Sequence, residues 1–176
     1  MNNLEQAGRL DSASIRVSPT VQQHSNQQEA SAASVIFRAG LACGVLDITA
    51  AFVTWSLRGV SPYRLLQAIA SGLLGVQAFR GGWPTALLGA AIHFFIAFSV
   101  ATVFYAASRK LKLMTQHAIR SGFAFGIAVY LVMYLIVMPL SRIQPTPFSL
   151  SRTVIAIVTH MFCVGLPISL TVRRLS

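Results

Sequence analysis

The chain has 176 residues, of which 55% are hydrophobic and 10% are charged, and its formal net charge is +10. A water-soluble domain carries about 25% charged residues, so the composition excludes an ordinary soluble globular domain. The positive charge does not indicate nucleic-acid binding, because the basic residues flank apolar segments and do not gather on one polar face. The partner that this composition predicts is a lipid bilayer.

Residues 1–33 are polar and rich in Ser, Gln, Asn and Ala, without apolar periodicity. Such a segment buries too little apolar surface to fold, so we expect a disordered cytoplasmic leader. It does not resemble a secretory signal peptide, because no apolar stretch follows a basic start. Residues 34–176 are expected to form one transmembrane domain.

Four long apolar segments follow the leader, and they cover residues 35–57, 84–107, 119–140 and 153–172. A helix needs about 20 residues to cross the apolar core of a bilayer, and each segment is close to that length. Helices are favoured over strands because a helix satisfies its own backbone hydrogen bonds within one segment. The sequence therefore predicts an all-α bundle of four transmembrane helices.

A shorter apolar piece between the first two spans, residues 62–76, predicts a further helix. Ser61 followed by Pro62 is typical of a helix start, with the serine as N-cap and the proline in the first turn. One face carries apolar residues and another carries polar residues, namely Leu66, Ile69, Leu73 and Val76 against Arg64, Gln67 and Ser71. Because the piece is amphipathic and too short to span, we expect an interfacial helix. A re-entrant hairpin is the less favoured alternative.

The basic residues are unevenly divided between the two sides of this bundle. Nine lie on the side of both termini and five lie on the other side. The side of the termini includes the short second loop, whose basic residues are Arg109, Lys110, Lys112 and Arg120. Since short cytoplasmic loops carry an excess of Lys and Arg, both termini are predicted to be cytoplasmic.

Three of the four spans carry a single ionisable residue near mid-span, and these residues are Asp47, His93 and His160. An isolated charge is costly in hydrocarbon, so such residues usually face a protein interior and mark a site. Counted from the same side, they lie about ten, nine and seven residues deep. At roughly 1.5 Å per residue these depths agree within about 5 Å. We therefore predict that the three side chains meet in one polar centre.

Three roles of this polar centre stay open. In the first, the side chains satisfy one another and fix helix register in a structural or assembly subunit. In the second, they form a proton or cation pathway, because Asp and His are typical of proton relays. In the third, the chain is a haem- or metal-binding redox protein, with the set His93, His160, Cys43 and Cys163 as candidate ligands.

The sequence favours a non-enzymatic protein without a cofactor, because motifs for metal binding and catalysis are missing. It contains no Cys-x-x-Cys or His-Glu-x-x-His run, no Gly-x-Ser-x-Gly elbow and no phosphate-binding loop. Cys43 and Cys163 lie inside apolar spans, so we expect buried free thiols and no secreted disulfide framework. The sequence does not specify a substrate, an oligomeric state or a physiological partner.

The first and third spans begin with a similar pattern, which indicates an internal repeat. Arg38–Gly44 and Arg120–Gly126 share Arg, a small residue, Gly, an apolar residue, Ala, any residue and Gly. The second and fourth spans share a His-x-Phe run, at His93 and His160. The pattern predicts two helical hairpins in the same orientation, with the two histidines at matched depths.

Each repeat begins with a Gly-x-x-x-Gly run, and the glycines are Gly40, Gly44, Gly122 and Gly126. Glycine removes side-chain bulk and lets helix backbones approach closely. Packing inside the bundle is favoured over a dimer interface, because four helices have to pack on one another. A homo-oligomer stays an open alternative.

Three runs, Gly40–Asp47, Ser61–Gly75 and Leu88–Phe94, resemble a group of small uncharacterised bacterial four-helix inner-membrane proteins. The resemblance covers most of the chain after the leader. It implies a location in a bacterial inner membrane, and no activity comes with it.

Overall fold

The computed structural model describes residues 31–143 and 148–175. Every regular element in these residues is helical, so the predicted all-α class is confirmed. The leader predicted over residues 1–33 lies outside the described residues, apart from its last three.

Four helical spans are long and apolar enough to cross a membrane, as predicted. The first is α2 (Ala32–Ser56) and the second is α4 (Gly82–Lys110). The third joins α6, a π turn η4 and α7, which are Ala118–Val132, Met133–Val137 and Met138–Leu140. The fourth joins α8, a π turn η5 and α9, which are Leu150–Thr159, His160–Gly165 and Leu166–Leu175. They contain 25, 29, 23 and 26 residues, so each exceeds the predicted span by at least one residue.

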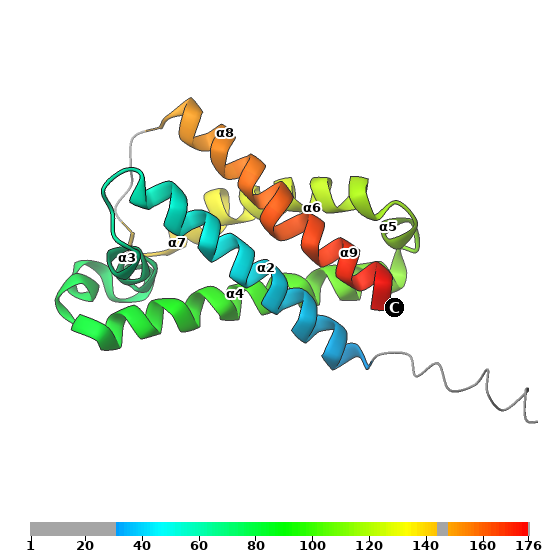
Figure 1. Ribbon diagram of the computed structural model, residues 1–176, viewed down its shortest axis with the longest axis horizontal. Coiled ribbons are helices and arrows are strands. Elements are labelled where there is room, and N and C mark those ends of the chain that lie inside the picture. Colours follow the sequence, from blue (N-terminus) through cyan, green and yellow to red (C-terminus); the bar gives the residue numbers. More distant parts are fainter. Residues whose placement is uncertain (1–30, 144–147, 176) are drawn as a thin grey trace, which may run out of the picture.

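The four spans alternate in direction, so that the bundle has two distinct ends (Figure 1). The start of α2, the end of α4, the start of α6 and the end of α9 lie together, and we call this the terminal end. A short helix, α5 (Leu113–Gln116), joins α4 to α6 there. Within the bundle α2 packs on α4, η5 and α9, and α6 packs on η5 and α9.

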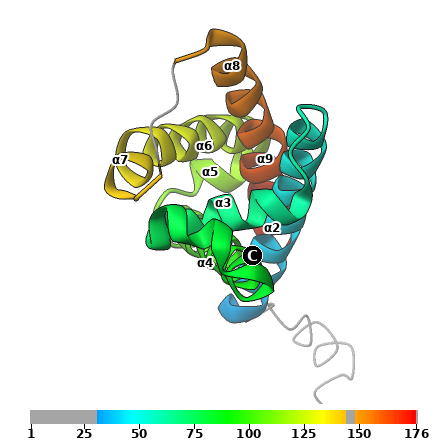
Figure 2. The same ribbon diagram turned by 90° about the vertical axis from the view of Figure 1, so that its left-hand side faces the viewer.

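The remaining helix, α3 (Pro62–Leu74), lies across the opposite end of the bundle, which we call the α3 end. Figure 1 shows α3 almost end-on while α4 runs across the picture, and Figure 2 shows α3 in front of α4. The predicted N-cap is confirmed, because the Ser61 side chain accepts a hydrogen bond from the Arg64 backbone N–H. A 3-10 turn, η3 (Gly75–Arg80), then leads to α4. Gly89 of α4 lets the two helices touch, since a Cβ there would lie 2.7 Å from the Leu66 carbonyl carbon.

The polar face of α3 turns towards the protein. Gln67 is 1% exposed and Ser71 is 6% exposed, whereas Leu73 and Val76 of the apolar set are each 60% exposed. The Gln67 amide nitrogen donates to the Tyr63 hydroxyl, the Gly82 carbonyl and the Thr85 hydroxyl, at 3.2, 3.2 and 3.3 Å. The glutamine thereby ties α3 to the start of α4, and Leu73 and Val76 are left exposed on the surface of the bundle.

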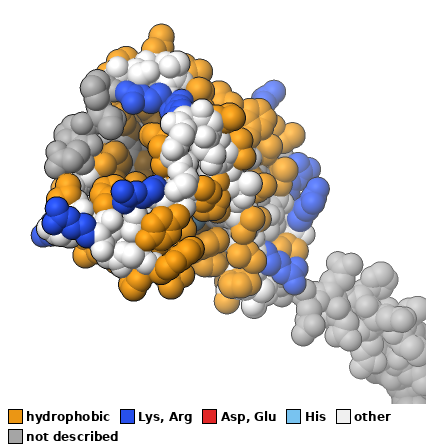
Figure 3. Space-filling view, turned by 60° about the vertical axis from the view of Figure 1, so that its left-hand side comes forward, with side chains coloured by type: hydrophobic (Ala, Val, Ile, Leu, Met, Phe, Trp, Pro, Cys, Tyr) orange, Lys and Arg blue, Asp and Glu red, His pale blue; other side chains and the backbone are white. Residues whose placement is uncertain are grey.

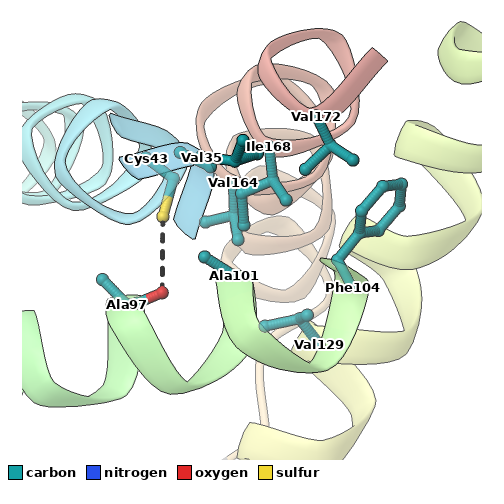
Figure 4. Packing of buried hydrophobic residues seen from close by; sticks show 10 residues of the cluster. Val35, Cys43, Ala97, Ala101, Phe104, Val129, Val164, Ile168 and Val172 are labelled. Atoms are coloured by element: carbon teal, nitrogen blue, oxygen red, sulfur yellow. Dashed lines mark hydrogen bonds between the residues drawn. The ribbon is translucent and has the colours of Figure 1, made fainter. Parts of the chain in front are cut away.

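Apolar packing is concentrated at the terminal end. The buried cluster contains Val35, Ala39, Cys43, Ala97, Ala101, Phe104, Val129, Val164, Ile168 and Val172. Figure 4 shows these side chains converging from α2, α4, α6, η5 and α9. Phe104 and Ile168 are fully buried, and the Phe104 ring meets the Phe125 ring edge-on at 4.9 Å. The terminal half of the bundle is therefore a closed apolar core.

Each π turn lies just before a proline. η4 precedes Pro139 and η5 precedes Pro167. A proline inside a helix cannot donate a backbone hydrogen bond, and its ring clashes with the carbonyl four residues earlier. Those carbonyls belong to Leu135 and Cys163, which lie inside the two wide turns. The π turns therefore accommodate the prolines without breaking the spans, and such turns are frequent at functional sites.

The sides of the bundle expose a largely apolar surface. In the most apolar window of each span, only 17% to 33% of the residues are buried inside the protein. Figure 3 shows hydrophobic side chains over most of the visible face, with Lys and Arg gathered towards its two ends. Soluble monomers do not expose contiguous apolar surface of this extent. The four spans thus indicate a multi-pass membrane protein.

Candidate functional site

The three ionisable mid-span residues line one cavity inside the bundle. This inner cavity has a volume of about 130 Å³, and Asp47, His93 and His160 contribute to its wall. Cys43 and apolar residues complete the wall, namely Ile69, Ile96, Ala97, Val100, Val129, Met133 and Val164. All four spans and α3 therefore meet around it. The cavity lies where the apolar core of the terminal half ends.

His93 is held by a hydrogen bond across the first helical hairpin. Its Nε2 lies 2.9 Å from the carbonyl oxygen of Gly44 in α2. A carbonyl only accepts, so Nε2 carries the proton. In the neutral ring Nδ1 then keeps a lone pair and is free to accept a proton. The edge of the Phe94 ring packs against the imidazole, with the centroids 5.3 Å apart.

His160 is held by its own helix. Its Nδ1 lies 2.8 Å from the carbonyl oxygen of Ala156, one turn earlier in α8. Nδ1 is therefore the donor, and Nε2 of the neutral ring is the acceptor. The ring also meets Tyr130 edge-on, with the centroids 5.8 Å apart. Both histidines are thus oriented by backbone carbonyls, and each keeps one nitrogen that can take up a proton.

A second, larger cavity opens from the same residues towards the α3 end of the bundle. This end cavity has a volume of about 320 Å³ and lies between α2, the span of α6 and α7, and α8. Asp47 and His160 line it, as do Arg58 near the end of α2 and Arg152 near the start of α8. Its other walls include Thr54, Trp55, Tyr130, Tyr134, Phe148 and Ser149.

Asp47 and His160 therefore border both cavities, whereas His93 borders the inner cavity alone. The order of side chains along the spans explains this. From the terminal end, α2 presents core residues up to Cys43, then Asp47, then the end cavity. The last span runs in the opposite direction and presents Val164 in the core, then His160, then the end cavity. Asp47 and His160 form the boundary between the two compartments.

The glycine runs bring the helices of each hairpin together beside the histidines. A Cβ at Gly44 would lie 2.8 Å from the Phe94 ring of α4, and one at Gly40 would overlap the Phe98 ring. In the second hairpin a Cβ at Gly126 would lie 2.6 Å from both the His160 carbonyl oxygen and the Met161 Cα.

Gly122 likewise faces the neighbouring span, since a Cβ there would lie 3.0 Å from the carbonyl oxygen of Gly165. All four glycines of the repeat thus face the partner helix of their own hairpin. In each hairpin the second glycine of the run touches the histidine or the residue beside it.

The alternative set of metal ligands is not brought together. Cys43 lines the inner cavity, but Cys163 lines neither of the two cavities described above. Both are free thiols, and Cys43 Sγ contacts the carbonyl oxygens of Gly40 and Ala97 at 3.4 and 3.9 Å (Figure 4). Among residues 31–143 and 148–175, no three His, Cys, Asp or Glu side chains are grouped so as to hold a metal ion.

The haem alternative does not fit the inner cavity either. Pockets for drug-sized ligands measure roughly 300–1,000 Å³, and the cavity that both imidazoles face measures about 130 Å³. That volume suits a few water molecules or a small ion.

Sequence reasoning missed the residues of the end cavity. Arg58 and Arg152 are two of the five basic residues on the side opposite the termini, and the sequence pattern does not single out Tyr130 or Tyr134. Helical spacing contains a signal, because Asp47, Ala51, Thr54 and Arg58 recur on one face of α2 or its extension. Ser149, Thr153, Ala156 and His160 recur in the same way on α8. Two such polar stripes that each end at a mid-span ionisable residue predict a shared cavity.

Comparisons with protein-family models, with curated proteins and with solved structures gave no match for this chain. The resemblance to a bacterial inner-membrane group therefore gains no support from them.

Proposed function

We propose that this protein moves protons across a bacterial inner membrane, with Asp47, His93 and His160 as the groups that take up and release them. Both termini are assigned to the cytoplasm, because the basic residues of the terminal side outnumber those of the α3 side. The proposal rests above all on the position of Asp47 and His160 at the boundary of both cavities, with His93 on the inner one.

Protons are favoured over metal cations by the charges of the end cavity. Arg58 and Arg152 line this cavity, and guanidinium groups stay charged at all physiological pH values. Two fixed positive charges raise the electrostatic energy of an approaching cation. A proton passes between titratable side chains and water without a bare cation entering the cavity.

A carrier is favoured over an open pore, because the terminal half of the bundle is closed by the apolar core. No continuous polar route follows from Asp47 through Phe104, Ile168 and Val172, all of which are buried. Protons taken up from the α3 end therefore need a conformational change before release at the terminal end.

Proton flux into liposomes tests the proposal. The purified full-length chain is reconstituted with a pH-sensitive dye inside, and an imposed pH gradient starts the reaction. We expect flux above that of empty liposomes, and we expect Asp47→Asn to reduce it about tenfold or more, as loss of a relay carboxyl group does. Thr49→Val on the exposed, lipid-facing side of α2 is the matched control and keeps wild-type flux.

Two results contradict the proposal. One is wild-type flux no greater than in empty liposomes, and the other is undiminished flux in Asp47→Asn. If the wild type shows no flux while Asp47→Asn and His160→Gln lower the thermal stability in detergent, the polar centre is structural.

A further inference from the structure

The end cavity combines fixed positive charge with aromatic walls, and proton movement does not require that combination. Two guanidinium groups, from Arg58 and Arg152, and one carboxyl group, from Asp47, line it. The Arg58 guanidinium lies over the Trp55 ring, with Cζ 5.4 Å from the ring centroid. This cation–π contact positions the charge at the cavity wall. Positive groups thus outnumber negative ones in the space.

The walls beyond the charges are mainly aromatic and apolar. Tyr130 and Tyr134 are stacked with their ring centroids 5.9 Å apart, and Trp55, Phe148 and Ile155 also line the cavity. Ligand pockets are lined mostly by apolar and aromatic side chains, with a few polar groups that fix the orientation of the ligand. The tyrosine hydroxyls and the side chains of Ser149 and Thr153 are polar groups of this kind.

We propose that the end cavity binds an amphipathic molecule with an oxyanion head, a phosphate or a carboxylate. The head lies between Arg58 and Arg152, and the first methylene groups of the apolar part lie against Trp55 and the two tyrosines. Guanidinium pairs with such oxyanions through two parallel hydrogen bonds, which makes Arg the preferred partner. The site goes beyond the proposed proton movement and exists whether or not protons move.

The volume limits what enters. About 320 Å³ lies at the lower limit of pockets for drug-sized ligands. The cavity therefore suits a head group with a short apolar part and does not enclose a whole lipid. A free short-chain amphipath and the head group of an anionic phospholipid share this chemistry, and the experiment separates them.

The test uses the full-length chain with Trp83→Phe, so that Trp55 is the only tryptophan, in nanodiscs of phosphatidylcholine. The probe is hexyl phosphate, titrated at constant pH without a proton gradient. We expect a saturable change in Trp55 fluorescence, with the same Kd by isothermal titration calorimetry. Inorganic phosphate is expected to bind about tenfold more weakly, because it buries no methylene groups.

Arginine variants identify the site. Arg58→Gln and Arg152→Gln are each expected to raise the Kd for hexyl phosphate about tenfold or more, as loss of a charge-assisted hydrogen bond does. Arg80→Gln is the matched control, because Arg80 lies at the same end of the bundle but lines neither cavity. Its Kd is expected to stay within about twofold of the parent value, as for other exposed charges. Gel filtration and thermal melting in detergent verify that each variant is folded.

The outcomes are distinct. Displacement of hexyl phosphate by phosphatidylglycerol in the nanodisc assigns the site to a lipid head group, and a lack of displacement assigns it to a free amphipath. Both support the site. The proposal is overturned if hexyl phosphate does not saturate, if hexyltrimethylammonium binds as tightly, or if all three arginine variants change the Kd equally. Because no proton gradient is present, a protein that moves no protons still gives a clear answer.

Discussion

His93 of α4 donates from its Nε2 to the carbonyl oxygen of Gly44 in α2, over 2.9 Å. The contact joins the histidine of the first hairpin to the second glycine of its Gly-x-x-x-Gly run. In the second hairpin, Gly126 packs against the backbone of His160 and Met161. The glycine run and the histidine of each repeat are thus neighbours in space. The sequence repeat therefore corresponds to the same helix–helix contact in both hairpins.

The hydrogen bond of His93 predicts different results for two substitutions. His93→Gln keeps an N–H donor that reaches the Gly44 carbonyl, so we expect the free energy of unfolding to change little. His93→Leu removes the donor and is expected to lower that free energy by about 0.5–1.5 kcal/mol. Both are expected to reduce proton flux, since neither side chain takes up a proton. Thermal unfolding in detergent and liposome flux are the two measurements, and flux retained in both variants would remove His93 from the pathway.

Gly126 lies at a close backbone contact between α6 and η5. Gly126→Ala would place a Cβ 2.6 Å from backbone atoms of His160 and Met161, so the helices must separate. Overpacking of this kind costs about 1–3 kcal/mol, and we expect a matching drop in the free energy of unfolding.

Gly72→Ala is the control for Gly126→Ala. Its Cβ would meet no atom closer than 3.7 Å, and alanine favours the helical conformation of α3. Equal melting temperatures for the two variants would show that α6 and η5 are not in backbone contact.

The hydrogen bonds of Gln67 are expected to hold α3 on the bundle. Gln67→Leu keeps the volume but removes the donor to Tyr63, Gly82 and Thr85, and it removes the acceptor of the Arg64 guanidinium. We expect a loss of about 1–3 kcal/mol in the free energy of unfolding. Gln77→Leu, at an exposed position of η3, is expected to change it by less than about 0.5 kcal/mol. Limited proteolysis between α2 and α4 reports the same difference, and equal cleavage rates would contradict the role of Gln67.

Thiol labelling tests the two halves of the bundle. In a Cys163→Ser background, a thiol introduced by Ala51→Cys faces the end cavity, while native Cys43 is 1% exposed in the core. We expect membrane-impermeant methanethiosulfonates to modify position 51 and to leave Cys43 unmodified. Labelling of Cys43 at the same rate would show that the core around Cys43 is open to the reagent.

The charge of the reagent adds a second measurement at position 51. The anionic sulfonatoethyl reagent is expected to react about tenfold faster than the cationic trimethylammonioethyl reagent, after normalisation to a free thiol. Arg152→Gln should bring this ratio close to one, and Arg80→Gln should not. If the ratio of anionic to cationic labelling rates is equal in all variants, the guanidinium groups do not determine the electrostatic potential of the end cavity.

Much of the fold follows from the sequence, because the length of each span and the depth of a residue within it can be counted along the chain. The apolar runs predict the four helices, and Ser61 and Pro62 predict the start of α3. Counting residues along the spans predicts that Asp47, His93 and His160 lie at one level. The inner cavity has all three in its wall, although their role stays a proposal.

Other features depend on which faces meet, and one sequence does not specify this. The burial of Gln67 and Ser71 follows from the contact of α3 with α4, whereas their polarity alone would place them towards water. The end cavity combines residues of three spans that are far apart in the chain. Pro167 predicts a disturbed helix, but the π turn that begins at His160 depends on how α6 packs against it through Gly126.

For the proposed proton movement, the apolar core at the terminal end also predicts which step of the cycle is slow. The end cavity already borders Asp47 and His160 from the α3 end, so access from that side leaves the core undisturbed. Access from the terminal end, which we propose to be cytoplasmic, requires Phe104, Ile168 and Val172 to separate, and exposing each such side chain costs about 1.5–3 kcal/mol. We therefore predict that opening at the terminal end limits the rate of the proposed proton movement, and that turnover accelerates when one of these three side chains is shortened.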